Sequence, residues 1–73
     1  MKKNDVIAIF SQNMKLIRIK KEMTQEELSF KSGLHRNYIS DTERGRRNIS
    51  LKAAEKIAEG LEVDLKELFL AID

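Results

Sequence analysis

Apolar residues recur along the chain at helical spacing, and short polar or glycine-containing segments separate the runs. Within residues 5–21, Ile7, Phe10, Met14 and Ile17 fall at positions i, i+3, i+7 and i+10, which lie on one face of a helix. Other apolar residues of this segment lie off that face. We therefore expect a first helix that is apolar on more than one side.

A capping signal marks the start of a second helix. Thr24 is followed three residues later by Glu27, the spacing of a capping box, in which each residue accepts a hydrogen bond from the backbone of the other. Met23 precedes the cap and Leu28 follows it at the positions of a hydrophobic staple. This pattern predicts a helix over residues 24–32.

Three glycines follow stretches with helical periodicity. Gly33, Gly45 and Gly60 each stand where a left-handed residue commonly closes a helix. After Gly33 we expect a third helix over residues 35–44. Its main apolar residue is Ile39, so a helix this short and polar must be held by its neighbours.

Two further caps predict the last helices. Ser50 can cap a fourth helix that runs to about residue 59, and Asp64 with Glu67 forms a second capping box that opens a fifth. The chain shows no strand pattern, linker or internal repeat. We therefore expect an all-α, compact five-helix bundle that forms a single domain over residues 1–73.

Composition excludes several classes of function. The chain has 73 residues, 36% of them charged, with no cysteine and no proline. It therefore has no disulfide, no thiolate zinc site and no cysteine nucleophile. The single histidine and the absence of a catalytic carboxylate pair predict no metal, no cofactor and no enzymatic activity. No apolar run approaches the ~18 residues of a membrane span, so we expect a cytoplasmic, nucleoid-associated bacterial protein without a membrane partner.

Charge is divided unevenly along the chain. Up to Lys52 there are twelve Lys or Arg and six Asp or Glu, and from Ala53 onward two Lys and six Asp or Glu. The segment up to Lys52 therefore has a net charge of +6 and the segment from Ala53 a net charge of −4, which together give the net charge of +2. This division is typical of a polyanion-binding body whose acidic end faces away, although ordinary solvated charge is an alternative.

The second and third predicted helices, joined by a glycine turn, form a helix-turn-helix arrangement. In this arrangement the second helix fits the major groove of DNA, and residues near its N-terminus reach the base edges. The preceding helix points its N-terminus at phosphates, and Thr24 and Gln25 stand there. Residues 35–44 are therefore the expected reading helix.

Three motifs carry a resemblance to a known family: MTQEEL at 23–28, SGL at 32–34 and YISDTERG at 38–45. They resemble the phage-repressor (Cro-like) helix-turn-helix family, and the match runs from about residue 10 to residue 69. Within that family, GLHRNYIS with ERGRRN is most similar to the controller proteins of restriction–modification systems. The resemblance implies a transcription regulator that binds a pseudo-palindromic operator as a homodimer, activating at low concentration and repressing when a second site fills.

The resemblance also implies roles for individual residues. The base-reading positions would be Arg36, Asn37, Tyr38, Ser40 and Asp41. Contacts with the DNA backbone or minor groove would come from Thr24, Gln25, His35, Arg44, Arg46, Arg47 and Asn48. Arg18 and Glu43 match the positions of an internal ion pair between the first and third helices. His35 departs from the family, because Ser, Thr or Asp usually fills its capping position and histidine is a poor cap.

The C-terminal end, about residues 61–73, is the expected dimer interface. It carries more apolar residues than one side of a short helix can bury: Leu61, Val63, Leu65, Leu68, Phe69 and Ile72. Part of this group would close the core and part would be exposed, which usually marks an interface. A two-fold dimer would set the reading helices about 34 Å apart. The alternative is a fifth helix that only caps the core.

The sequence is compatible with further partners and with two alternative functions. Pairs of dimers could bind adjacent sites, and the regulator could contact RNA polymerase. The first alternative function is a phage- or plasmid-type repressor, or an antitoxin whose apolar end binds its toxin. The second is a protein-interaction module without DNA binding, against which Arg36, Arg44, Arg46 and Arg47 argue.

Overall fold

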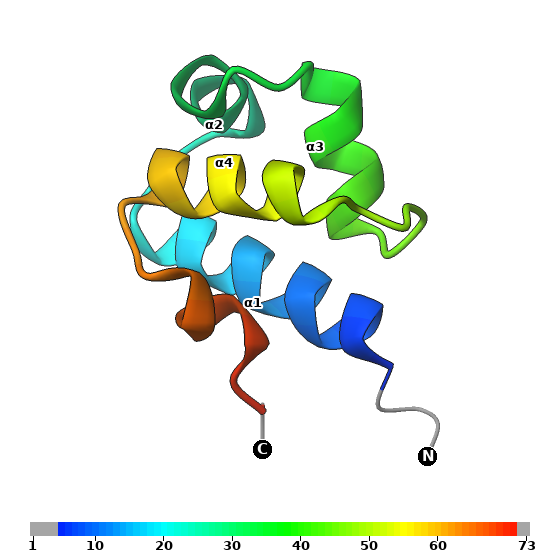
Figure 1. Ribbon diagram of the computed structural model, residues 1–73. Coiled ribbons are helices and arrows are strands. Elements are labelled where there is room, and N and C mark those ends of the chain that lie inside the picture. Colours follow the sequence, from blue (N-terminus) through cyan, green and yellow to red (C-terminus); the bar gives the residue numbers. More distant parts are fainter. Residues whose placement is uncertain (1–4, 72–73) are drawn as a thin grey trace.

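The computed structural model describes residues 5–71 and shows four α-helices followed by one short 3-10 turn (Figure 1). The elements are α1 (Val6–Lys20), α2 (Gln25–Ser32), α3 (Arg36–Glu43), α4 (Leu51–Leu61) and η1 (Leu65–Phe69). In Figure 1, α4 lies between α1 and the α2–α3 pair, and η1 returns against α1. Residues 5–71 contain no strand, which confirms the all-α class.

The expectation of a fifth α-helix is wrong, because η1 is a five-residue 3-10 turn. Asn13 of α1 is buried, and its Nδ2 donates to the carbonyl oxygens of Leu68 at 3.0 Å and Leu70 at 2.8 Å. Both carbonyls lie at the end of this segment, where the last backbone carbonyls have no partner within the helix, and the Asn13 amide supplies their hydrogen bonds. The segment therefore closes the core as a single turn.

Local caps set the other helix boundaries as the sequence predicts. Thr24 Oγ1 accepts from the Glu27 N–H at 3.0 Å, and Glu27 Oε1 accepts from the Thr24 N–H at 2.8 Å. Ser50 Oγ caps α4 at 3.0 Å. Gly33 and Gly45 have φ angles of 77° and 72°, in the left-handed region that glycine adopts without steric cost. The capping box and both glycine positions are confirmed.

Gly60 does not end the fourth helix, contrary to expectation. Helix α4 continues through it to Leu61, and Glu62 closes the helix with a left-handed φ of 62°. A Cβ on Gly60 would lie 2.9 Å from Leu28 Cδ1 and 3.1 Å from Ser32 N. The glycine therefore allows α4 to approach α2 closely, and its role is packing rather than capping.

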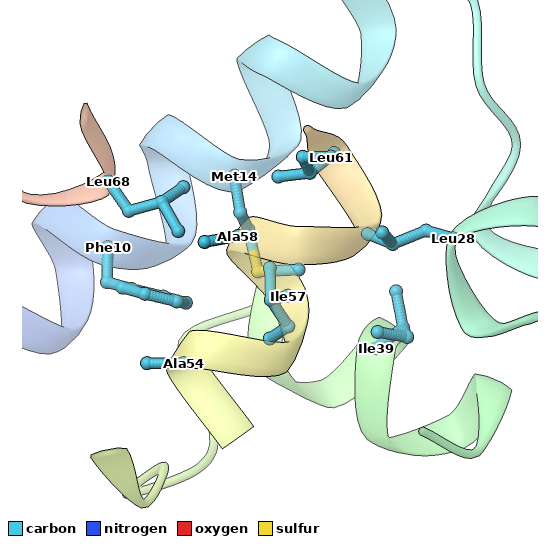
Figure 2. Packing of buried hydrophobic residues seen from close by; sticks show 9 residues of the cluster. All are labelled: Phe10, Met14, Leu28, Ile39, Ala54, Ile57, Ala58, Leu61 and Leu68. Atoms are coloured by element: carbon cyan, nitrogen blue, oxygen red, sulfur yellow. The ribbon is translucent and has the colours of Figure 1, made fainter. Parts of the chain in front are cut away.

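The core lies where α4 packs against α1, α2 and η1 (Figure 2). All five elements contribute to one cluster: Phe10, Met14, Leu28, Ile39, Ala54, Ile57, Ala58, Leu61 and Leu68. Complete burial of a Leu, Ile, Phe or Met side chain stabilises a protein by about 1.5–3 kcal/mol. Helix α3 supplies only Ile39 to this cluster, so other interactions must fix its orientation.

Two residues assigned to the dimer interface lie in this core, and that assignment is wrong. Leu61 and Leu68 are both 0% exposed, so neither side chain has surface left for a partner. Leu61 belongs to the last turn of α4 and Leu68 to η1, and both point into the cluster in Figure 2. Because the chain is small, these side chains are needed to complete its own core.

The other residues of the expected interface have mixed positions. Val63 and Leu65 are half-buried against the core cluster. Phe69 remains 38% exposed, and its ring centroid lies 5.4 Å from that of Phe10. Ile72 lies outside the described residues. Of the named group within residues 5–71, Phe69 therefore offers the most apolar surface to a partner.

Gly60→Ala is expected to destabilise the protein. Alanine favours a helix over glycine by about 1 kcal/mol, but overpacking a tight contact costs about 1–3 kcal/mol, and here the new methyl group meets backbone as well as side chain. Urea unfolding should show a lower free energy of unfolding. Glu59→Ala, at the exposed neighbouring position of α4, is the control and should change stability little. A Gly60→Ala protein as stable as the wild type would contradict the packing role.

Candidate nucleic-acid interface

Hydrogen bonds hold the turn between α2 and α3 in one geometry. Gly33, in its left-handed conformation, donates its N–H to the Ser29 carbonyl at 2.9 Å. Ser29 Oγ donates to the Leu34 carbonyl, and the Leu34 N–H donates to Ser32 Oγ at 3.2 Å. These bonds fix the angle between α2 and α3 that Figure 1 shows.

Helix α3 has a buried face and a polar outer face. Ile39 and Thr42 are 0% and 3% exposed, and the Thr42 hydroxyl donates to the Tyr38 carbonyl at 2.7 Å, so it is paired although it is buried. The residues assigned to base reading keep accessible surface on the other side. Arg36 and Asn37 are exposed, and the rest are half-buried: Tyr38, Ser40 and Asp41.

His35 caps the reading helix. Its Nδ1 accepts a hydrogen bond from the Asn37 N–H at 3.0 Å, and its backbone has the extended conformation of an N-cap residue. Because Nδ1 accepts this bond, the neutral ring carries its proton on Nε2. The exposed imidazole therefore stabilises α3 and keeps one N–H donor for a ligand.

The C-terminal end of α3 is tied to α1 by a bidentate ion pair. Arg18 Nε lies 2.6 Å from Glu43 Oε2, and Arg18 Nη2 donates to Glu43 Oε1 at 3.0 Å. The two side chains are 12% and 3% exposed. The remaining Arg18 nitrogen, Nη1, donates to the Met23 carbonyl at 2.7 Å, just before the cap of α2. A planar guanidinium matches a carboxylate in this way, which lysine could not reproduce.

Gln25 joins the same carboxylate. It is the first residue of α2 and half-buried, and its Nε2 donates to Glu43 Oε1 at 3.0 Å. Thr24, the cap before it, is exposed. The start of α2 and the end of α3 are therefore held by one buried carboxylate.

Arginines in the loop after α3 have two kinds of environment. Arg47 Cζ lies 4.4 Å from the centroid of the Tyr38 ring, and Arg47 Nε lies 3.7 Å from Asp41 Oδ2. The first contact is a cation–π interaction and the second a half-exposed ion pair. Arg44 and Arg46 are exposed. Arg47 is therefore packed against α3, whereas the side chains of Arg44 and Arg46 are exposed to solvent.

Sequence reasoning missed three of these contacts. The bond from Gln25 to Glu43 and the stacking of Arg47 on Tyr38 join different elements, so no spacing along the chain indicates them. The capping position of His35 was visible from its place after the glycine turn. Its role was underestimated, because capping preferences describe side-chain oxygens rather than an imidazole nitrogen.

Residues 5–71 offer neither a metal site nor a membrane-spanning helix. No group of three or more His, Cys, Asp or Glu side chains in this part of the chain could hold a metal ion. None of the helices described there is long and apolar enough to cross a membrane.

Comparison with known proteins shows the family to which the chain belongs. Residues 14–68 match the helix-turn-helix family. The chain belongs to the Cro-like helix-turn-helix family. It is 48% identical over 66 residues to the control protein C.BamHI of Bacillus amyloliquefaciens, an alignment that covers 89% of this chain and 82% of the relative. Relatives in this family are transcription regulators rather than enzymes.

Solved structures show the same fold. The restriction–modification controller protein C.AhdI from Aeromonas hydrophila superimposes with a TM-score of 0.83 at 41% identity, over 86% of this chain and 96% of that chain. The controller protein C.Esp1396I, a tetramer in complex with its natural 35 base-pair operator, superimposes with a TM-score of 0.79 at 42% identity, over 86% and 93% of the two chains. The fold is therefore one that holds a DNA operator in a relative.

Glu43→Ala is expected to lower the free energy of unfolding by about 3 kcal/mol or more, because it leaves the Arg18 charge mostly buried without a partner. The double variant Arg18→Met/Glu43→Leu removes both charges and should lie closer to the wild type. Urea denaturation of the three proteins measures both effects. A double variant less stable than Glu43→Ala would contradict this account of the pair.

Proposed function

We propose that this protein is a sequence-specific transcription regulator that binds a pseudo-palindromic operator as a homodimer and controls a restriction–modification system. The observation that carries the proposal is the outward polar face of α3, which the Arg18–Glu43 pair and the Gly33 turn hold rigidly. Its relatives include controller proteins, one of them bound to an operator, which favours this function over a phage repressor or an antitoxin.

The exposed end of α3 reads the bases in this proposal. Arg36 can donate two hydrogen bonds to O6 and N7 of guanine, which contributes about 1–3 kcal/mol of discrimination against other bases. Asn37 beside it can pair with adenine, Tyr38 is the next residue of the helix, and Ser40 lies about one turn beyond Arg36. Asp41 is paired with Arg47, so its charge repels the DNA less and it can accept from a cytosine amine.

Phosphate contacts surround this reading face. Thr24 and Gln25 stand at the start of α2, where free backbone N–H groups and the helix dipole favour an anion. His35 supplies its Nε2–H from the start of α3. Arg44 and Arg46 are exposed cations that follow α3, and each phosphate that they neutralise releases counterions.

An apolar groove provides the surface for the second copy. It has a volume of about 340 Å³ and lies between the start of α1, the start of α4 and η1. Its lining includes three accessible apolar residues: Val6 at 56% exposed, Leu51 at 80% and Phe69 at 38%. Leu61 and Leu68 are buried and cannot form an interface, so we assign the interface to this groove instead. A two-fold contact needs an exposed patch that is complementary to itself.

The groove is placed well for a two-fold dimer on DNA. Asn48 and Leu51 line it, so it begins directly after the basic loop that follows α3. In a dimer with its two-fold axis at the groove, the two α3 helices would have to meet half-sites about 34 Å apart. The C-terminal segment from Ala53 onward, with its excess of Asp and Glu, would then lie at the dimer side, away from the phosphates.

The proposed circuit needs no small-molecule ligand. A dimer at a first site would activate transcription by contacting RNA polymerase, and a second dimer at an adjacent site would repress it as the protein accumulates. The tetramer of C.Esp1396I on a single operator supports the pairing of dimers. Bound to its operator, the regulator would lie on the nucleoid.

Arg36→Ala and Arg46→Ala should weaken binding in different ways. Arg36→Ala should lower the preference for one base at one position of each half-site by about 1–3 kcal/mol. Arg46→Ala should weaken binding to all duplexes and reduce the slope of log affinity against log salt concentration by about one. Anisotropy titrations at several salt concentrations, on the duplex upstream of the protein's own gene and on a scrambled duplex, measure both. Equal weakening by Arg36→Ala on both duplexes, or an unchanged slope for Arg46→Ala, would contradict these roles.

Leu51→Glu should dissociate the dimer without unfolding the protomer. Leu51 is 80% exposed and is the first residue of α4, where a glutamate interacts favourably with the helix dipole. Sedimentation equilibrium should show a monomer at concentrations where the wild type is a dimer. Ile19→Glu, an exposed apolar position at the far end of α1, is the control and should stay dimeric. A dimeric Leu51→Glu protein would place the interface elsewhere.

A further inference from the structure

Glu43 accepts more hydrogen bonds than an ion pair with Arg18 needs. Its Oε1 receives both Arg18 Nη2 and Gln25 Nε2, each at 3.0 Å, while Oε2 receives Arg18 Nε at 2.6 Å. The carboxylate is 3% exposed and belongs to the last residue of α3, whereas Gln25 is the first residue of α2. One buried group therefore spans from the reading helix to the position expected to face a phosphate.

This contact determines the orientation of the Gln25 amide. A carboxylate only accepts hydrogen bonds, so the amide must turn its NH2 group, and not its oxygen, toward Glu43. One N–H of that group is used by Glu43, and the second N–H on the same nitrogen is left for another acceptor. Without the carboxylate, the amide could turn its oxygen toward an incoming phosphate, which would repel it.

Arg18 makes this arrangement compatible with DNA. A lone carboxylate beside the start of α2 would repel phosphate, but the bidentate guanidinium neutralises Glu43. Arg18 also donates to the Met23 carbonyl at 2.7 Å, which holds the chain that leads into α2. The mostly buried Arg18 side chain thus neutralises the carboxylate next to Gln25 and also holds the backbone that leads to Gln25.

We propose that Glu43 is a positioning residue for DNA binding: it fixes the Gln25 amide so that the second N–H of Gln25 donates to one operator phosphate in each half-site. This rests on the proposed function, since it assumes that α2 faces DNA. It extends that function by coupling the phosphate contact to the reading helix, because Glu43 moves with α3. A displaced α3 would misdirect the Gln25 donor as well as the base-reading side chains.

The test is a scan of single phosphates. Operator duplexes that carry one neutral methylphosphonate, at each position of a half-site in turn, are titrated with wild type and with Gln25→Met. The wild type should lose about tenfold in affinity at one phosphate, since a hydrogen bond to a charged group contributes about 1.5–3 kcal/mol. Gln25→Met should bind the unmodified duplex about tenfold more weakly and show no further loss at that phosphate. Gln12→Met, the same change at an exposed position of α1, is the control and should keep the wild-type pattern.

A second variant separates positioning from folding. Glu43→Asp keeps the charge that pairs with Arg18 but shortens the reach to Gln25, so sensitivity should fall at the same phosphate and stay unchanged at the others. A purely structural role would weaken binding at all phosphates alike. NMR of the wild type should show two distinct Gln25 side-chain amide protons, of which only one shifts when the operator binds. This measurement keeps the test decisive if Glu43→Asp does not fold.

The outcomes separate this inference from the function on which it rests. Wild-type protein that prefers no duplex over a scrambled one would overturn both. Specific binding in which Gln25→Met keeps the full wild-type sensitivity at every phosphate would overturn the inference alone. A uniform loss in Glu43→Asp, or a shift of both Gln25 amide protons on binding, would also overturn the positioning role and leave the regulator function intact.

Discussion

The buried carboxylate of Glu43 is the constraint on which the DNA-facing half of this protein depends. With 3% of its side chain exposed, its charge has lost nearly all hydration, and Arg18 and Gln25 must compensate for that loss. Since these residues belong to α3, α1 and α2, compensating the charge also orients three helices. Hydrophobic burial could not do this alone, because α3 contributes one side chain, Ile39, to the core cluster.

Packing and recognition are divided between different parts of a short chain. The apolar cluster is built mainly from α1 and α4 and closed by η1, and the fit of α4 to α2 depends on the missing side chain of Gly60. This leaves α3 free to be polar over most of its surface. The helix that would read DNA is therefore stabilised by its cap, its ion pair and its neighbours rather than by its own composition.

The features that the sequence predicted are those with local causes. The capping box of Thr24 and the left-handed Gly33 depend on residues within a few positions, and both appear as expected. Gly60 was misread because the contact that requires a glycine there is with α2. The last segment was misread because its hydrogen bonds run to Asn13, more than fifty residues away, and no local pattern indicates them. In the site, the helices were predictable from local patterns. Of the contacts between elements, the Arg18–Glu43 pair was expected from the family resemblance, whereas the Gln25–Glu43 bond and the Arg47–Tyr38 contact were not.

The proposed dimer explains the division of charge along the chain. The basic segment up to Lys52 faces DNA, and the acidic segment, which includes most of α4 and all of η1, lies away from it. The most direct test of the central claim is selection of bound duplexes from a randomised pool by the wild-type protein, followed by sequencing. The account predicts enrichment of an inverted repeat whose half-sites are centred about one DNA turn apart. A selected pool without a common sequence, or with an unrepeated single site, would contradict it.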